Sequence, residues 1–191
     1  MVSNVRSLKP KAGLLILHIE LKWVEPVIWR RVVVSERITL GRLHAVIQIA
    51  MGWYDEHLHE FEIAGEKYGI PDPDGCGVPI HAEARKTLIK ALNGENTFSY
   101  LYDFGDGWEH QITVEEKQPA GRRKVPRCID GANACPPEDI GGAGGYAYFL
   151  EVMADPNHPE YEAMLEWYGW RFNPTHFDKA SVNEWLRSIE A

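Results

Sequence analysis

The chain has 191 residues, of which 45% are hydrophobic and 25% are charged, a composition typical of a globular protein and not of a disordered one. Its formal net charge of −8 disfavours sequence-independent binding to nucleic acid, because phosphate backbones carry charge of the same sign. The apolar runs near the N-terminus are far shorter than the roughly 20 residues of a membrane helix, and no secretory signal is visible. We therefore expect a cytoplasmic protein that does not contact a membrane.

The first part of the chain alternates between strand and helix signals. Residues 12–22 and 28–34 have apolar side chains at every second position, which predicts two strands joined by a hairpin connection. Thr39 is a candidate N-cap, and the apolar residues from there to Met51 recur at helical spacing before Gly52. Residues 57–63 alternate again, so His57 and His59 are expected on one face of a third strand.

The second part predicts a further hairpin and a helical C-terminus. Residues 71–81 are rich in proline and glycine and predict a loop, and residues 82–92 predict a short helix. Strands are expected at 98–102 and 108–116, with the turn 103–107 between them. Residues 128–145 predict a long loop, and helices are expected at 146–154, 158–168 and 179–189. The whole predicts an α+β fold, with a single mixed or antiparallel sheet that starts ββαβ and C-terminal helices packed around it.

Three histidines form the first candidate site. His57 and His59 share a strand face, His110 lies on another predicted strand, and Asp103 and Asp106 lie in the turn that leads to it. If the strands are neighbours, these nitrogen and oxygen ligands suit a divalent ion such as zinc or manganese, or iron. The alternative is that the histidines are hydrogen-bonded structural groups and that the aspartates only form a tight turn.

The cysteines give weaker signals. Cys76, Cys128 and Cys135 are odd in number and widely spaced, so free thiols or a metal are expected in preference to disulfides. Zinc sites place paired cysteines two to four residues apart, and the wider spacing of Cys128 and Cys135 gives that interpretation little support.

Two basic segments carry a nucleic-acid alternative. Exposed tryptophans beside them could stack on bases, although charge runs are usually solvated surface. The basic residues are Arg30, Arg31, Arg37 and Arg42 in the first segment, and Arg122, Arg123, Lys124 and Arg127 in the second.

Several long strings together resemble a known family. They are PVIWRRVVV, TLGRLHAVIQIAMGW, HLHEFEIAGEKYG, FSYLYDFGDGWEHQITVE and CIDGANACPPEDIGGAGGYAYFLE. In this order they resemble the plasmid pRiA4b Orf-3-like family from about residue 14 to 178. The resemblance implies one compact α+β domain, here residues 1–191 with a core at about 12–178. It also implies a link to mobile elements, under a resolvase-like name for which this sequence lacks the serine and arginine arrangement. The family supplies motif positions and no roles.

We interpret the chain as a binding or interaction module, because its distinctive strings lie in turns and loops. The predicted binding residues are Asp103, Asp106, Trp108, His110, Glu138 and Asp139. The alternative function is a metal-dependent hydrolase or nuclease, in which His57, His59, His110, Asp103 and Asp106 surround one ion. Glu138 or Glu109 would then act as the base.

Overall fold

The computed structural model describes residues 12–71, 79–120 and 124–189. Its strands are β1 (Leu14–Leu21), β2 (Ile28–Ser35), β3 (His59–Ile63), β4 (Glu66–Gly69), β5 (His81–Ala82), β6 (Thr97–Tyr102), β7 (Trp108–Gln118) and β8 (Arg127–Ala132). Its helices are α1 (Leu40–Met51), α2 (Leu88–Leu92), α3 (Gly142–Ala154), α4 (Tyr161–Tyr168) and α5 (Lys179–Leu186), the last followed by a 3-10 turn, Arg187–Ile189.

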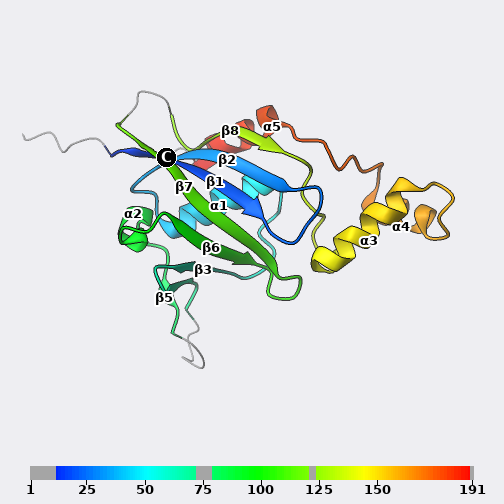
Figure 1. Ribbon diagram of the computed structural model, residues 1–191, viewed down its shortest axis with the longest axis horizontal. Helices are drawn as coiled ribbons and strands as arrows, with labels where there is room; N and C mark the ends of the chain where they lie inside the picture. Colours follow the sequence, from blue (N-terminus) through cyan, green and yellow to red (C-terminus); the bar gives the residue numbers. More distant parts are fainter. Residues whose placement is uncertain (1–11, 72–78, 121–123, 190–191) are drawn as a thin grey trace, which may run out of the picture.

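One sheet forms the centre of the molecule (Figure 1). Its strand order is β5-β4-β3-β6-β7-β1-β2-β8, and all pairs are antiparallel except β4 with β5. The predicted α+β class, the mixed sheet and the ββαβ start are therefore confirmed. Among the described helices, none is both long and apolar enough to cross a bilayer.

The first hairpin and helix form where the sequence predicts them. Leu15, Leu17 and Ile19 are fully buried on β1, as their alternation requires. Thr39 caps α1 by accepting a hydrogen bond from the backbone N–H of Arg42 at 3.4 Å. The helix ends at Gly52, whose φ of +95° is the left-handed conformation that glycine adopts without strain.

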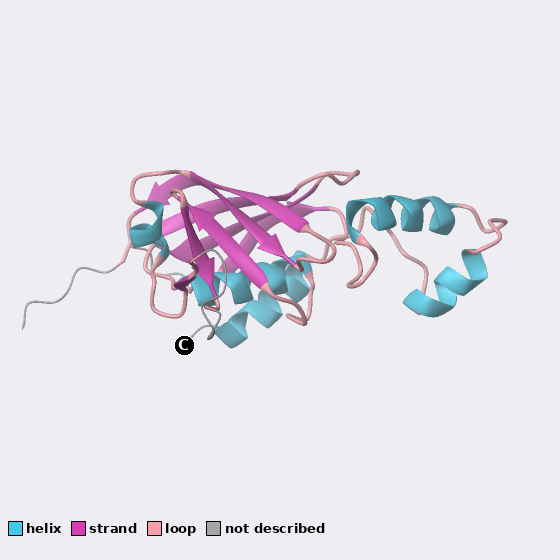
Figure 2. Cartoon of the chain, turned by 90° about the horizontal axis from the view of Figure 1, so that it is seen from below, coloured by secondary structure: helices cyan, strands magenta, loops and turns pink. Residues whose placement is uncertain are grey.

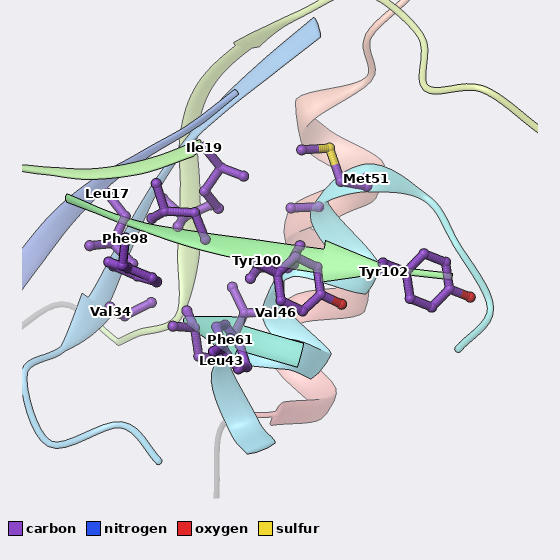
Figure 3. Packing of buried hydrophobic residues seen from close by; sticks show 14 of the residues in the cluster. Leu17, Ile19, Val34, Leu43, Val46, Met51, Phe61, Phe98, Tyr100 and Tyr102 are labelled. Carbon is purple, nitrogen blue, oxygen red and sulfur yellow. The ribbon is translucent and has the colours of Figure 1, made fainter. Parts of the chain in front are cut away.

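The core lies between α1 and one face of the sheet (Figures 2 and 3). Leu43 and Val46 project from α1 toward the strands, where Phe61 and Tyr100 meet them (Figure 3). All four side chains are fully buried. At roughly 1.5–3 kcal/mol for each large apolar side chain removed from water, the burial of this layer stabilises the packing of α1 on the sheet.

Two strands, β8 and β5, lie where the sequence predicts loop or helix, and β4 lies between residues 64 and 70, for which the sequence predicts no element. All of β8 except Arg127 falls inside the predicted loop 128–145, where Asp130 and Gly131, as turn formers, favour the prediction of a loop. Its pairing with β2 also shifts register between Arg31 and Val32, which interrupts the alternation that would reveal a strand. β4 and β5 span only four and two residues, too few for an alternating pattern to be recognised. Ala82, the predicted start of a helix, belongs to β5, and helix α2 begins at Leu88.

Helix α5 covers the edge of the sheet at β8. The side-chain amide of Asn183 accepts from the backbone N–H of Cys128 at 2.9 Å and donates to its carbonyl oxygen at 2.8 Å. Helices α3 and α4 instead pack on each other and stand away from the sheet (Figure 2). They are held by aromatic contacts, with the ring of Phe149 centred 5.0 Å from Phe172 and 5.5 Å from Tyr168.

A buried arginine joins the end of α1 to β8. The guanidinium of Arg30, 2% exposed, donates to the carbonyl oxygens of Ala50 at 2.8 Å, Ala132 at 2.7 Å and Asn133 at 2.9 Å. It also lies over the ring of Phe177, 4.1 Å from the centroid. These acceptors explain how a full positive charge is tolerated inside the protein, since a buried charge is costly unless it is hydrogen-bonded.

Candidate functional site

Three side chains from different parts of the sequence meet beyond the ends of β3 and β6. His57 Nε2 lies 3.1 Å from Asp139 Oδ1 and 3.7 Å from Asp103 Oδ2. One ligand atom from each residue lies within 4.8 Å of the other two. We refer to His57, Asp103 and Asp139 as the His57 cluster.

The backbone fixes the direction of Asp103. Its φ is +55°, and its Oδ1 accepts a hydrogen bond from the backbone N–H of Gly105 at 2.9 Å. This local bond is typical of aspartate in a turn, and it leaves Oδ2 to face His57. Asp139 also has a left-handed backbone, with φ of +57°. Left-handed non-glycine residues of this kind are uncommon and often lie at functional sites.

The loop that carries Asp139 is fastened to the turn that carries Asp103. The backbone N–H of Gly141 donates to Asp106 Oδ2 at 3.1 Å. A Cβ on Gly142 would clash with the carbonyl oxygen of Asp106, and one on Gly145 would clash with that of Ile140. Gly142, which ends the PPEDIGG string, and Gly145 therefore permit close backbone approach, which is a structural role.

Glu138 lies beside the cluster with half of its carboxylate bonded. Its Oε1 accepts from the backbone N–H of Tyr54 and from the Tyr102 hydroxyl, both at 3.0 Å. Its Oε2 is buried and has no hydrogen-bond partner among the described residues. Burial raises the pKa of Glu138 above its usual range, and burial together with Glu138 raises the pKa of Tyr102.

A second set of polar groups lies next to the first. His44 Nε2 is 2.7 Å from Asp55 Oδ1, and its Nδ1 is 2.8 Å from the hydroxyl of Tyr100, which also accepts from Gln48 Nε2 at 3.0 Å. A carboxylate only accepts, so His44 Nε2 carries the proton and Nδ1 accepts from Tyr100. His59 stacks on His44, with ring centroids 3.5 Å apart. We call these five residues the His44 network.

The His44 network is a hydrogen-bonded structure and a poor metal site. His44, Asp55 and His59 place ligand atoms within 4.8 Å of one another. With metal–ligand bonds of about 2.1 Å, however, two ligands at right angles are about 3.0 Å apart, so the 2.7 Å between His44 and Asp55 has the length of a hydrogen bond. His59 Nε2 likewise lies 2.8 Å from Glu83 Oε2. Burial, followed by the charge of His59, lowers the pKa of His44, which favours its neutral form.

A surface pocket of about 450 Å³ opens between His57 and the His44 network. Acidic and imidazole groups line it, including Asp55, Glu56 and Glu83. Two exposed apolar side chains, Leu58 and Ile70, also line it. The volume lies in the range of small-molecule sites, and the mixture of apolar and polar lining is typical of such sites.

The structure separates the three histidines that the sequence grouped as metal ligands. His57 precedes β3, so it need not share a strand face with His59. His59 lies instead with His44 and Asp55, in the His44 network. His110 is fully buried and donates from Nδ1 to the carbonyl oxygens of Trp108 at 3.0 Å and Tyr100 at 3.2 Å. Burial lowers its pKa to about 4. Among the described residues His110 belongs to neither group of possible metal ligands, so the structure does not bring the three histidines together.

The six predicted binding residues divide in the same way. Asp103, Glu138 and Asp139 come together at the His57 cluster. Asp106 fastens the neighbouring loop, and Trp108 is buried with its Nε1 unpartnered among the described residues. Glu109, expected as an alternative base, accepts from Trp23 Nε1 at 2.9 Å, outside both groups of possible metal ligands among the described residues.

Sequence reasoning missed the His44 network, although a signal was present. His44 and Gln48 are four residues apart on the buried side of α1, which they share with Leu40, Leu43 and Ile47. Two polar residues at helical spacing on an apolar stripe indicate a buried hydrogen-bond network, because burying them without partners is costly.

Burial disfavours the thiolate form of the two cysteines that the structure describes. Cys128 and Cys135 are free thiols, and burial raises the pKa of both, that of Cys135 to about 11. Cys135 Sγ contacts Met51 Sδ at 3.3 Å and lies 3.5 Å from Arg30 Nη2. Cys76 lies outside the described residues.

Comparisons with known proteins place the chain in a family. The uncharacterized protein y4hQ of Sinorhizobium fredii is 43% identical over 174 residues, which cover 90% of this chain and 87% of that protein. A crystal structure of a protein of unknown function from Methanosarcina mazei matches with a TM-score of 0.81 and 36% identity, covering 88% of this chain and 97% of that one. Residues 14–181 match the family described as plasmid pRiA4b ORF-3-like protein. The resemblance of the sequence motifs is thereby confirmed, and the chain belongs to the plasmid pRiA4b ORF-3-like protein family.

Proposed function

We propose that this protein is a binding module whose ligand is a divalent metal ion, held by His57, Asp103 and Asp139. The observation that carries the proposal is the state of His57 Nε2. This nitrogen is buried and has no hydrogen-bond partner among the described residues, although carboxylate oxygens lie 3.1 and 3.7 Å away. A ring nitrogen that faces two carboxylates without hydrogen-bond alignment is arranged as ligands are around a cation.

The separations support the same interpretation. Ligand atoms about 2.1 Å from an ion are about 3.0 Å apart at a right angle and about 3.4 Å apart at a tetrahedral angle. The distances of 3.1 and 3.7 Å from His57 Nε2 lie close to these values. One nitrogen and two carboxylate oxygens suit zinc, manganese or ferrous iron better than the all-oxygen shell typical of calcium.

Exposure leaves room for a further ligand. The side chain of Asp139 is 66% exposed and that of His57 is 28% exposed, whereas Asp103 is 10% exposed. An ion held on this side of the molecule would keep coordination positions open to water or to a ligand in the adjacent pocket. Structural zinc sites, by contrast, are closed by four protein ligands.

The test is metal binding by protein purified without a histidine tag. Titration calorimetry with Zn²⁺ and Mn²⁺ should give about one site per chain, and His57→Ala should weaken binding by at least about tenfold. His81→Ala is the matched control, because His81 is exposed and pairs with Glu66 at 3.0 Å outside the cluster. Absence of saturable binding in the wild type, or equal affinity in His57→Ala, would overturn the proposal.

A second candidate function, metal-dependent hydrolysis, is favoured by Glu138. Its Oε1 is anchored by Tyr54 and Tyr102, and its Oε2 is buried without a partner beside the cluster. A carboxylate oriented in this way could take a proton from a metal-bound water. Glu138→Gln should then abolish Mn²⁺-dependent hydrolysis of bis-p-nitrophenyl phosphate while the calorimetric metal affinity stays within about threefold. Hydrolysis that survives this substitution would exclude the role.

A link to mobile elements or to nucleic acid stays a prediction. The His57 cluster brings carboxylates together, and these repel phosphate backbones unless a cation lies between them. Metal binding is therefore the first property to measure, and nuclease activity is worth assaying only in protein that has bound metal.

A further inference from the structure

Helices α3 and α4 form an arm that projects from the molecule beyond the sheet (Figures 1 and 2). We call residues 142–168, which comprise both helices and their connection, the helical arm. The two helices pack on each other, and the exposed positions of α4 recur at helical spacing, so they form one continuous face. The residues of this face are Glu162, Ala163, Glu166 and Trp167.

The helical arm is strongly acidic. Its 27 residues include five aspartates and glutamates and no lysine or arginine, so the arm contributes −5 to the formal net charge of −8. The acidic residues are Glu151, Asp155, Glu160, Glu162 and Glu166. All five are exposed, and none takes part in an ion pair within the part of the chain that the structure describes. Like charges gathered on one surface repel one another, and a cationic partner would relieve this repulsion.

Two tryptophans expose large aromatic rings at the C-terminal end of the helical arm. Trp167 is 52% exposed and Trp170 is 67% exposed. The ring of Trp167 is centred 6.3 Å from Phe149, and that of Trp170 lies 5.3 Å from Tyr168, which is itself 5.5 Å from Phe149. Both exposed rings therefore belong to one aromatic cluster, whose central ring, Phe149, is fully buried. Aromatic rings supported in this way lose little conformational freedom when a partner binds.

We propose that the exposed face of the helical arm binds an arginine-rich segment of a partner protein. A guanidinium group pairs with a carboxylate through two N–H donors, and its planar surface stacks on an indole ring. Arginine therefore matches both features of this surface, the carboxylates of Glu162 and Glu166 and the ring of Trp167. Lysine would supply the same charge as a compact ammonium group without the planar surface.

The charge of the helical arm disfavours other occupants. Nucleic acids and anionic membrane surfaces carry charge of the same sign as the arm. In a symmetric dimer the same patch of both chains meets itself, so two arms that each carry −5 would lie against each other. A basic protein segment has the complementary charge.

The experiment is calorimetric titration of the full chain with two capped 12-residue peptides. One peptide alternates arginine and glycine, and the other alternates lysine and glycine. EDTA is present at constant ionic strength, so the result does not depend on metal at the His57 cluster. Saturable binding is expected, and the arginine peptide should bind about threefold more tightly, the effect of one exposed cation–π contact. Trp167→Ala should remove this difference between the two peptides.

Matched controls separate the helical arm from the rest of the surface. Trp185→Ala removes a tryptophan that is 69% exposed on α5, and this variant should bind both peptides as the wild type does. Because Trp167 also contacts Phe149, a second variant tests the surface without altering the aromatic cluster. Glu162→Gln combined with Glu166→Gln should weaken binding of both peptides about fivefold. Removal of two exposed charges from the sheet, by Glu62→Gln with Glu116→Gln, should have little effect.

Four outcomes would overturn the proposal. The first is absence of saturable binding by the wild type. The second is an equal loss of affinity in the two double variants, which would indicate only the overall charge. The third is equal affinity of the wild type for the two peptides, which would exclude stacking of arginine. The fourth is a mass of two chains by light scattering that returns to one chain in Trp167→Ala, which would assign the face to a second copy.

Discussion

Asp106 accepts a hydrogen bond from the backbone of Gly141, 35 residues further along the chain, at 3.1 Å. This bond fastens the loop that carries Asp139 to the turn that carries Asp103. The geometry of the His57 cluster therefore depends on a residue that does not belong to the cluster. Asp106 lies on the turn before β7, where it positions Asp139 without facing His57.

Replacing Asp106 should weaken metal binding only because the loop that carries Asp139 is no longer held in place. In Asp106→Ala the loop loses its hydrogen bond to the turn, so the Zn²⁺ dissociation constant is expected to rise about tenfold. The unfolding free energy without metal should fall by only about 1 kcal/mol. Asp106→Asn retains an oxygen acceptor and should recover most of the affinity. If Asp106→Ala binds Zn²⁺ as tightly as the wild type, the loop is held by other contacts.

The Asp103→Asn variant should separate metal binding from folding. Asparagine tolerates the left-handed backbone at this position and can still accept from Gly105, so the Tm without metal should stay near that of the wild type. The wild type should gain about 2.7 kcal/mol at a Zn²⁺ concentration 100 times its dissociation constant, and the variant should gain far less. Differential scanning fluorimetry with and without Zn²⁺ measures both quantities. A lower Tm in metal-free Asp103→Asn would instead give the charge a structural role.

Replacement of Arg30 should cause one of the largest losses of unfolding free energy in this protein. Arg30→Met leaves the buried carbonyl oxygens of Ala50, Ala132 and Asn133 without their donor, and a loss of at least about 3 kcal/mol in unfolding free energy is expected from urea denaturation. Arg31→Met is the neighbouring control. Arg31 pairs with Glu115 at 2.6 Å near the surface, where such a pair contributes about 1 kcal/mol or less. Similar losses in the two variants would contradict this account.

Burial of His110 predicts acid-sensitive stability. Its pKa is about 4 in the folded chain against an ordinary value of 6.5, so between these pH values the unfolded chain binds a proton that the folded chain does not. Unfolding free energy should fall as pH is lowered through this window, by roughly 3 kcal/mol in total from this residue. In His110→Asn the side-chain amide can still donate to the strand carbonyls but does not titrate. Denaturation curves from pH 7 to 4 should then have a smaller pH slope, and an unchanged slope would assign the acid sensitivity to other groups.

The sequence predicts elements well where one period continues unbroken. Leu15, Leu17 and Ile19 alternate without interruption, and α1 has both an N-cap and a terminal glycine, so these elements form as expected. β8 could not be recognised in the same way, since its pairing with β2 changes register and its apolar residues do not alternate cleanly.

Sites depend on contacts that periodicity does not encode. A strand boundary displaced by two residues was enough to put His57 and His59 into different sets of side chains. The sequence indicates both Asp103 and Asp139 as candidates, yet their convergence requires a loop closure over 36 positions that only the folded chain shows. The burial of His110 follows from the packing of Trp53 and Tyr100 around it, and no local pattern reports those contacts.

The amide of Asn183 imitates a neighbouring strand, since it offers Cys128 the same donor and acceptor that another backbone would offer. An outer strand with free backbone groups invites recruitment of a strand from a second molecule, which is a common beginning of aggregation. At Cys128 this hydrogen-bonding capacity is already used within the chain. A strand from a second molecule could pair with β8 at Cys128 only after α5 had been displaced. The helix therefore disfavours intermolecular association at this edge of the sheet.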